Sequence, residues 1–203
     1  MYNETMAVIG EAITRKPEAT VRAVGYFVSA TIQQRFHTMP TVLDDWHSIG
    51  IDAPTCWGNK KNTVKHLDAN SAHLASQILT LREDRNNPLA IRDSIDVLLT
   101  IPGLGIVKAA FFAQILGFDV GCIDVHNARK FGVKLGAFSV TPKLSARTRL
   151  AKIESYKALC DGLGGSAYLW DQWCTLVAMQ YPTHFADPTV VSDLHHQLIT
   201  KYI

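Results

Sequence analysis

Asp124 is the residue whose type and position most strongly suggest chemistry. It stands where a new helix is expected to begin, in the segment IDVHNAR that runs from Ile123 to Arg129. Backbone N–H groups and the positive end of a helix dipole keep such a carboxylate ionised. It could then stabilise the cation that develops as a base leaves its sugar, or orient the attacking water. The alternative is a helix cap without chemistry.

A glycine turn upstream could hold an anion. Residues 101–105 read IPGLG and are followed by IVKAA, with an apolar helix expected on each side. Two glycines at a helix start leave backbone N–H groups open to a phosphate. Such a helix-hairpin-helix binds nucleic acid through its backbone without reading sequence. Gly103, Leu104, Gly105 and Ile106 are therefore candidate DNA contacts. A plain turn between two helices, with glycine needed only for packing, is the alternative.

Together the two segments resemble the helix-hairpin-helix DNA glycosylase superfamily. Members pair a hairpin of the type LPGxGxxxA with a (V/L)DxHxxR segment, which correspond here to IPGLGIVKA and IDVHNAR. The close resemblance covers residues 98–132, and the chain is similar to a divergent, phage-type member. The resemblance implies that Asp124 is the essential aspartate. His126 and Arg129 match the tail of the segment. His126 would contact a phosphate or make a structural hydrogen bond. Arg129 would anchor the DNA backbone or form an ion pair.

Lys108 departs from the pattern of this superfamily. Members that also cleave the DNA strand place a nucleophilic lysine two residues after the second glycine, where this chain has Val107. One position along a helix turns a side chain by about 100° and moves it by about 1.5 Å. Efficient strand cleavage is therefore not expected. Lys108 is interpreted as a phosphate contact or a solvated helix residue in preference to a catalytic amine, and all three roles stay open.

A second basic cluster lies at residues 57–61, which read WGNKK. Residues 53–67 contain three lysines and no acid. We interpret residues 40–62 as an irregular loop in which Trp57 stacks on a base while Asn59, Lys60 and Lys61 contact DNA. The alternative is a surface loop with Trp57 packed into the core.

Composition and charge fit an intracellular DNA-binding protein. The 203 residues are 47% hydrophobic and 19% charged, enough to bury a core. Residues 101–160 contain nine Lys/Arg and three Asp/Glu, a net +6 that favours an anionic partner. No apolar run suits a membrane helix and no leader is recognisable. The four cysteines, spaced 66, 38 and 14 apart, indicate reduced thiols and neither a metal site nor an iron–sulfur cluster. No cofactor is expected.

The hydrophobic periodicity predicts an all-α fold. Helices are expected from Pro17, over 67–81 and 88–99, and over 106–116, with further helix starts at Thr141-Pro142, Ser166 and Asp187-Pro188. The family resemblance implies two helical lobes. Residues 38–125 would carry the hairpin, residues 1–37 and 126–203 would form the second, discontinuous lobe, and Asp124 would face the cleft between them.

The leading functional hypothesis is a monomeric enzyme that binds double-stranded DNA, flips a base and cleaves its N-glycosidic bond with Asp124. Two alternatives stay open. One is a phage-type transferase that joins an amino acid or amine to an activated hydroxymethyl pyrimidine in DNA. The other is a non-catalytic helix-hairpin-helix protein that only binds DNA. The expected location is the cytoplasm or nucleoid of a bacterial or phage-infected cell.

Overall fold

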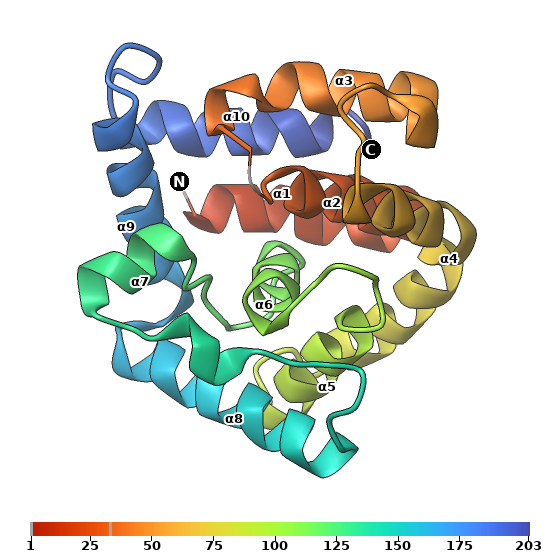
Figure 1. The fold of residues 1–203 in the computed structure, drawn as a ribbon, viewed down its shortest axis with the longest axis vertical. Coiled ribbons are helices and arrows are strands. Elements are labelled where there is room, and N and C mark those ends of the chain that lie inside the picture. The colour runs from red at the N-terminus through yellow and green to blue at the C-terminus, as the bar shows by residue number, and fades with distance from the viewer. Residues whose placement is uncertain (1, 33) are drawn as a thin grey trace.

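The protein is all-helical, as the periodicity predicted. The computed structural model describes residues 2–32 and 34–203, apart from the side chains of residues 3–5. The described residues contain no strand, and their α-helices (Figure 1) are α1 (Tyr2–Arg15), α2 (Pro17–Ala30), α3 (Met39–Ile49), α4 (Asn59–Arg82), α5 (Pro88–Leu98), α6 (Ile106–Ile115), α7 (Val125–Phe131), α8 (Ala146–Gly162), α9 (Gly165–Gln180) and α10 (Pro188–Thr200). Short 3₁₀ turns cover Phe36–Thr38, Gly50–Asp52 and Leu135–Phe138.

Helix α6 occupies the middle of the molecule. In Figure 1 it is surrounded by α1 and α2 above, α5 and α8 below, and α7 and α9 at the side. Apart from Lys108 and the buried Gln114 its residues are apolar, which suits a helix enclosed by others. Val107 and Lys108 in its first turn are its partly exposed residues. These two residues face the candidate site described below.

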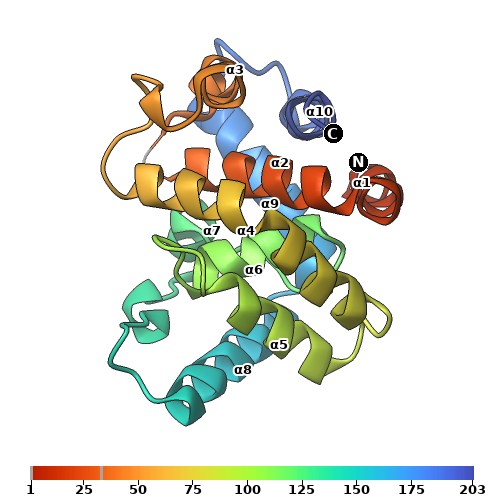
Figure 2. The same cartoon turned by 90° about the vertical axis from the view of Figure 1, so that its right-hand side faces the viewer.

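Helices α2 and α4 make the most extensive helix pair and lie together across the molecule in Figure 2. Their close approach depends on Gly25, since a Cβ placed there would come within 2.7 Å of a Leu67 methyl group. The C-terminal end of α2 is thereby held beside the start of α4.

Helix starts followed the predicted signals at some positions only. Pro17 and Pro88 begin α2 and α5 as expected, and Asp187 caps α10. The expected start at Thr141-Pro142 was wrong. Ser145 caps α8 instead, and its hydroxyl accepts a hydrogen bond from the N–H of Thr148. The expected cap at Ser166 was also wrong.

Ser166 lies within α9, which follows Gly164 in a left-handed conformation, and its hydroxyl donates to Asp119. The predicted loop over 40–62 needs a further correction. Residues 40–49 belong to α3 and residues 59–62 to α4, so the irregular part is limited to about the 53–58 turn.

The predicted two-lobe division stays a prediction. Helix α8 packs on α5, and α3 packs on α2 and α10, contacts that cross the expected boundary between 38–125 and the remainder. The buried apolar residues form one continuous core. All four cysteines are buried and free. Among the described residues no helix has the length and hydropathy to cross a membrane.

Candidate active site

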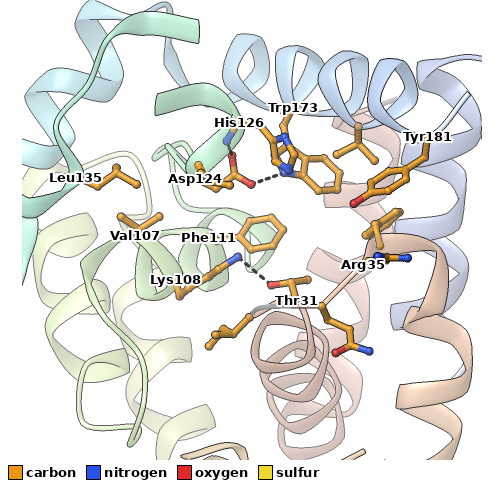
Figure 3. Close-up of a pocket in the computed structure, with 15 residues that line it drawn as sticks. Thr31, Arg35, Val107, Lys108, Phe111, Asp124, His126, Leu135, Trp173 and Tyr181 are labelled. Atoms are coloured by element: carbon orange, nitrogen blue, oxygen red, sulfur yellow. Dashed lines mark hydrogen bonds between the residues drawn. The ribbon is translucent and has the colours of Figure 1, made fainter. Parts of the chain in front are cut away.

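A pocket of about 480 Å³ opens where five parts of the chain meet. Its walls come from residues 31–32 and 34–36 after α2, the first turn and a half of α6, the start of α7 with Asp124, Leu135, and the C-terminal half of α9 with Tyr181. Figure 3 shows the side chains that converge there. Both catalytic candidates, Asp124 and Lys108, line this pocket.

Asp124 caps α7, as predicted, and its carboxylate is held by three N–H donors. Oδ1 accepts from the backbone N–H of His126 at 2.9 Å and of Asn127 at 3.2 Å. Oδ2 accepts from the indole Nε1 of Trp173 at 2.7 Å, the dashed line between the two side chains in Figure 3. Donors on both oxygens fix the orientation of the carboxylate at the pocket wall.

Asn127 fastens this corner of the site to α9. Its side chain is buried, and Nδ2 donates to the carbonyls of Cys122 at 2.8 Å and Leu169 at 3.1 Å. The first turn of α7 is therefore bound both to the segment that precedes it and to α9. This bracing holds Asp124 and Trp173 in register.

Lys108 reaches the same pocket from the first turn of α6. Its Nζ donates to Thr31 Oγ1 at 2.9 Å and lies 5.3 Å from the centroid of the Phe111 ring. Val107, which stands where the glycosylases that this sequence resembles carry lysine when they cleave the strand, also lines the pocket. The structure thus brings an amine to the pocket by a different helical position. Whether Lys108 acts chemically or binds phosphate stays a prediction.

Aromatic rings form the apolar part of the pocket wall. Phe36, Phe111, Trp173 and Tyr181 line it. Behind them lies His195, which is completely buried, with its ring centroid 4.7 Å from that of Phe36 and 4.6 Å from that of Trp173. Burial lowers the pKa of His195 to about 3. The imidazole is consequently neutral at physiological pH and supports the wall from behind.

The glycine turn joins α5 to α6; that it is a helix-hairpin-helix stays a prediction. Gly103 has φ +87°, and Pro102 O next to it accepts a hydrogen bond from Thr63 Oγ1 at 2.5 Å. Gly105 precedes α6 with open space where a Cβ would be. The side chains of Leu104 and Ile106 are buried, so these residues offer only backbone groups to a ligand.

A groove of about 780 Å³ runs beside this turn. Its sides are formed by residues 99–105, by residues 140–142 and by Asn59. Arg149, which forms a two-pronged ion pair with Asp96, closes one part of it. The predicted backbone-binding turn therefore lies against an open groove and is not packed under other elements.

The 57–61 cluster is divided between exposed and buried positions. Trp57 and Lys61 are exposed, and Asn59 begins α4. Lys60 corrects the prediction of a phosphate contact: it is only 6% exposed, with Nζ 5.8 Å from the Trp46 ring and 5.4 Å from the Trp57 ring. Its ammonium group is enclosed between two indoles, where a phosphate has no access.

The tail of the IDVHNAR segment also divides. His126 is half-buried and lines the pocket, whereas Arg129 is exposed on α7 and is not among the residues that line it. Their roles toward DNA stay predictions. Among the described residues no group of three or more His, Cys, Asp or Glu side chains is placed to hold a metal ion.

Sequence reasoning missed several pocket residues. Thr31, Arg35, Phe36, Trp173 and Tyr181 line the pocket and belong to no local motif. The one signal in the sequence was a pair of tryptophans, Trp170 and Trp173, about one helical turn apart. It could not show which ring would face Asp124.

Comparisons with protein-family models, with curated proteins and with solved structures returned no match.

Proposed function

We propose that this protein is a DNA-binding enzyme that acts on a base turned out of the double helix and cleaves its N-glycosidic bond. The observation that carries the proposal is the place of the Asp124 carboxylate. It lies in the wall of a pocket lined by aromatic rings, with both oxygens oriented by N–H donors. Aromatic walls suit a flat base, and enzymes that act on a base must take it out of the stack.

In the proposed reaction Asp124 faces the sugar of the extruded nucleotide. The bond between C1′ and the base nitrogen breaks, and the base leaves with the bonding electrons and takes up a proton. The negative charge of Asp124 stabilises the oxocarbenium-like cation that develops on the sugar. A water molecule oriented by the same carboxylate then adds to C1′ and gives up its proton. The products are a free base and an abasic site.

Helix α6 connects the proposed DNA grip with the pocket. The glycine turn ends at Gly105, at the start of α6, and Lys108 in the first turn of the helix already lines the pocket. The unobstructed backbone at Gly105 suits a phosphate at a helix start. A strand held at this turn lies close enough for a neighbouring nucleotide to enter the pocket.

The test is Asp124→Asn, assayed on a panel of duplexes with damaged or modified pyrimidines and purines. Asparagine caps helices as well as aspartate does, so folding should be retained while release of free base falls by ~10²–10⁴-fold. Duplex affinity should change little. The measurement is nucleoside analysis of the released and retained material, together with a DNA-binding titration.

Asp187→Asn is the matched control for this variant. Asp187 caps α10 with the same pattern, accepting from the N–H groups of the second and third residues that follow it. It is exposed and is not among the residues that line the pocket. Equal activity of the two variants, or full base release by Asp124→Asn, would exclude Asp124 as the catalytic group.

A second candidate is the transferase that joins an amine to an activated hydroxymethyl pyrimidine. The observation in its favour is that the pocket holds two cations, Lys108 and Arg35, neither of which forms an ion pair with a described acidic side chain. Such cations suit an anionic leaving group on the base. Mass spectrometry separates the two reactions, since transfer yields a heavier nucleoside and no abasic site. A protein that only binds DNA would change neither pool.

A further inference from the structure

Trp57 differs from the other tryptophans in its exposure. It is 52% exposed, whereas Trp46, Trp170 and Trp173 are at most 8% exposed. It precedes Gly58, whose φ of +57° turns the chain into α4. Trp57 is not among the residues that line the pocket beside Asp124. Its role is therefore separate from that of the pocket wall.

The indole of Trp57 is held in place from below. Lys60 Nζ lies 5.4 Å from its ring centroid and 5.8 Å from that of Trp46, and donates to Ala30 O at 3.5 Å. Because Lys60 is buried, its ammonium group forms a fixed support under one face of Trp57. Burial also lowers the pKa of Lys60. A large aromatic ring is thus presented to solvent in a fixed orientation.

The position of Trp57 links the two DNA-facing features of the protein. Asn59, two residues on, lines the groove beside the glycine turn, and Thr63 in the next turn of α4 donates to Pro102 O. On the other side, Lys60 contacts Ala30, whose neighbour Thr31 lines the pocket. Trp57 is therefore connected through Asn59 to the proposed backbone grip, and through Lys60 and Ala30 to the edge of the proposed base pocket.

The chain segment around Trp57 is cationic. Lys61 and Lys65 are exposed on the first two turns of α4, and residues 53–67 contain no acid. Lysines beside an exposed aromatic ring form the combination with which proteins hold an unstacked strand: the ring stacks on a base and the amines neutralise phosphates. The exposed ring and the lysines therefore suit DNA in which a base has left the stack.

We infer that Trp57 is a stacking platform for an unstacked base of the DNA held at the glycine turn, with Lys61 contacting the phosphate backbone next to it. This inference rests on the proposed function, since it takes DNA as the ligand. It adds a second contact, outside the pocket, which selects DNA that is already distorted. Base stacking on an aromatic side chain is tolerant of sequence, so no base preference is expected from it.

The test compares two synthetic DNAs, a fully paired duplex and the same duplex with a central two-nucleotide bulge. Native protein should bind the bulged DNA more tightly. Trp57→Ala should weaken bulge binding ~5- to 100-fold and leave the paired duplex nearly unchanged. Trp57→Phe should keep most of the preference, because it keeps a ring. Lys61→Ala should weaken both DNAs alike and lower the salt dependence of binding by about one phosphate contact.

Intrinsic fluorescence supplies a second measurement on the native protein. Trp57 is the tryptophan most open to acrylamide, so bulged DNA should reduce the quenchable fraction of the emission. Trp57→Phe should lack this response. DNA that binds without protecting Trp57, or Trp57→Ala that keeps the bulge preference, would overturn the inference and leave the surface to a partner other than DNA.

The two proposals fail in distinguishable ways. If Trp57 variants bind bulged DNA like the native protein while Asp124→Asn loses base release, the stacking platform is wrong and the proposed function stands. If the native protein binds neither DNA, both are wrong. If Trp57 behaves as expected but no base is released or modified by the native protein, the platform stands and the catalytic proposal falls.

Discussion

Two lysines from different helices donate to the C-terminal end of α2, and they differ in how deeply they are buried. Lys60 donates to the carbonyl of Ala30, the last residue of α2, and Lys108 donates to the hydroxyl of Thr31, which follows it. The carbonyl end of a helix attracts cations, so both contacts have a common cause. Lys60 is enclosed between two indoles, whereas Lys108 is half-buried in the wall of a pocket.

This difference shows that burial, and not residue type, decides what each amine is available for. Lys60 is the second residue of α4 and Lys108 the third residue of α6, so both stand in the first turn of a helix next to a glycine turn. The Lys60 amine is shielded from solvent and packs against the rings of Trp57 and Trp46. Lys108 has one ring beside it and keeps access to whatever enters the pocket.

Replacing each lysine by glutamate should show the difference between the two positions most clearly. Lys60→Glu places a carboxylate between two rings and beside the Ala30 carbonyl, with no donor to replace the lysine. We expect a loss of more than ~3 kcal/mol in the free energy of unfolding. Lys108→Glu should cost less than ~1 kcal/mol, because the site is half-exposed, but should weaken DNA binding at least ~10-fold.

Denaturant unfolding followed by circular dichroism measures the first effect and a DNA titration measures the second. Lys60→Met is the control that keeps the length of the side chain without its charge, and it should unfold close to the native protein. If Lys60→Glu were as stable as Lys108→Glu, the buried position of Lys60 would be refuted.

His195 extends the comparison to a second basic group among aromatic rings. As at Lys60, burial lowers its pKa, here to about 3. As pH falls below 6.5 the unfolded chain takes up a proton at this residue while the folded protein does not, so stability decreases. We expect His195 to contribute a loss of roughly 3 kcal/mol by pH 4 and none above pH 7.

The measurement is the unfolding free energy as a function of pH. His195→Phe should flatten the acid limb of this curve, whereas His73→Gln, at an exposed position, should not. The flattening should be partial, because burial also lowers the pKa of His47, to about 4. An unchanged acid limb in His195→Phe would show that the imidazole is reached by protons in the folded state.

Much of the fold was predictable because its signals are local. Proline at the first helical position marked α2, α5 and α10, and Asp124 caps α7 as expected. The α3 error was avoidable, since Met39, Val42, Leu43 and Trp46 are buried at helical spacing. The start of α8 was harder, because Ser145 introduces a polar run without a proline.

The site was predictable only where a motif carried it. The glycine turn and Asp124 lie within residues 101–129, and local sequence relates them. Trp173 reaches Asp124 across 49 residues, and Thr31, which holds Lys108, lies 77 residues away from it. Such pairs depend on helix packing. The burial of Lys60 depends on Trp46, which belongs to a helix that the sequence reading took for a loop.

The two glycines of the turn differ in the same way as the two lysines: Gly103 is packed against a neighbour, whereas Gly105 is open. Gly103 has φ +87°, and a Cβ there would meet Thr63 Oγ1 at 3.1 Å, so Gly103→Ala should cost ~1 kcal/mol in the free energy of unfolding.

Gly105 has φ −98° and open space where a Cβ would be, so Gly105→Ala should fold normally. Its new methyl group would instead stand at the proposed phosphate contact, so we expect the DNA affinity to fall severalfold. Thermal unfolding and duplex titration of both variants separate the two effects. If Gly105→Ala bound DNA like the native protein, the strand would have to lie elsewhere, because the groove beside the turn would then be open without being used.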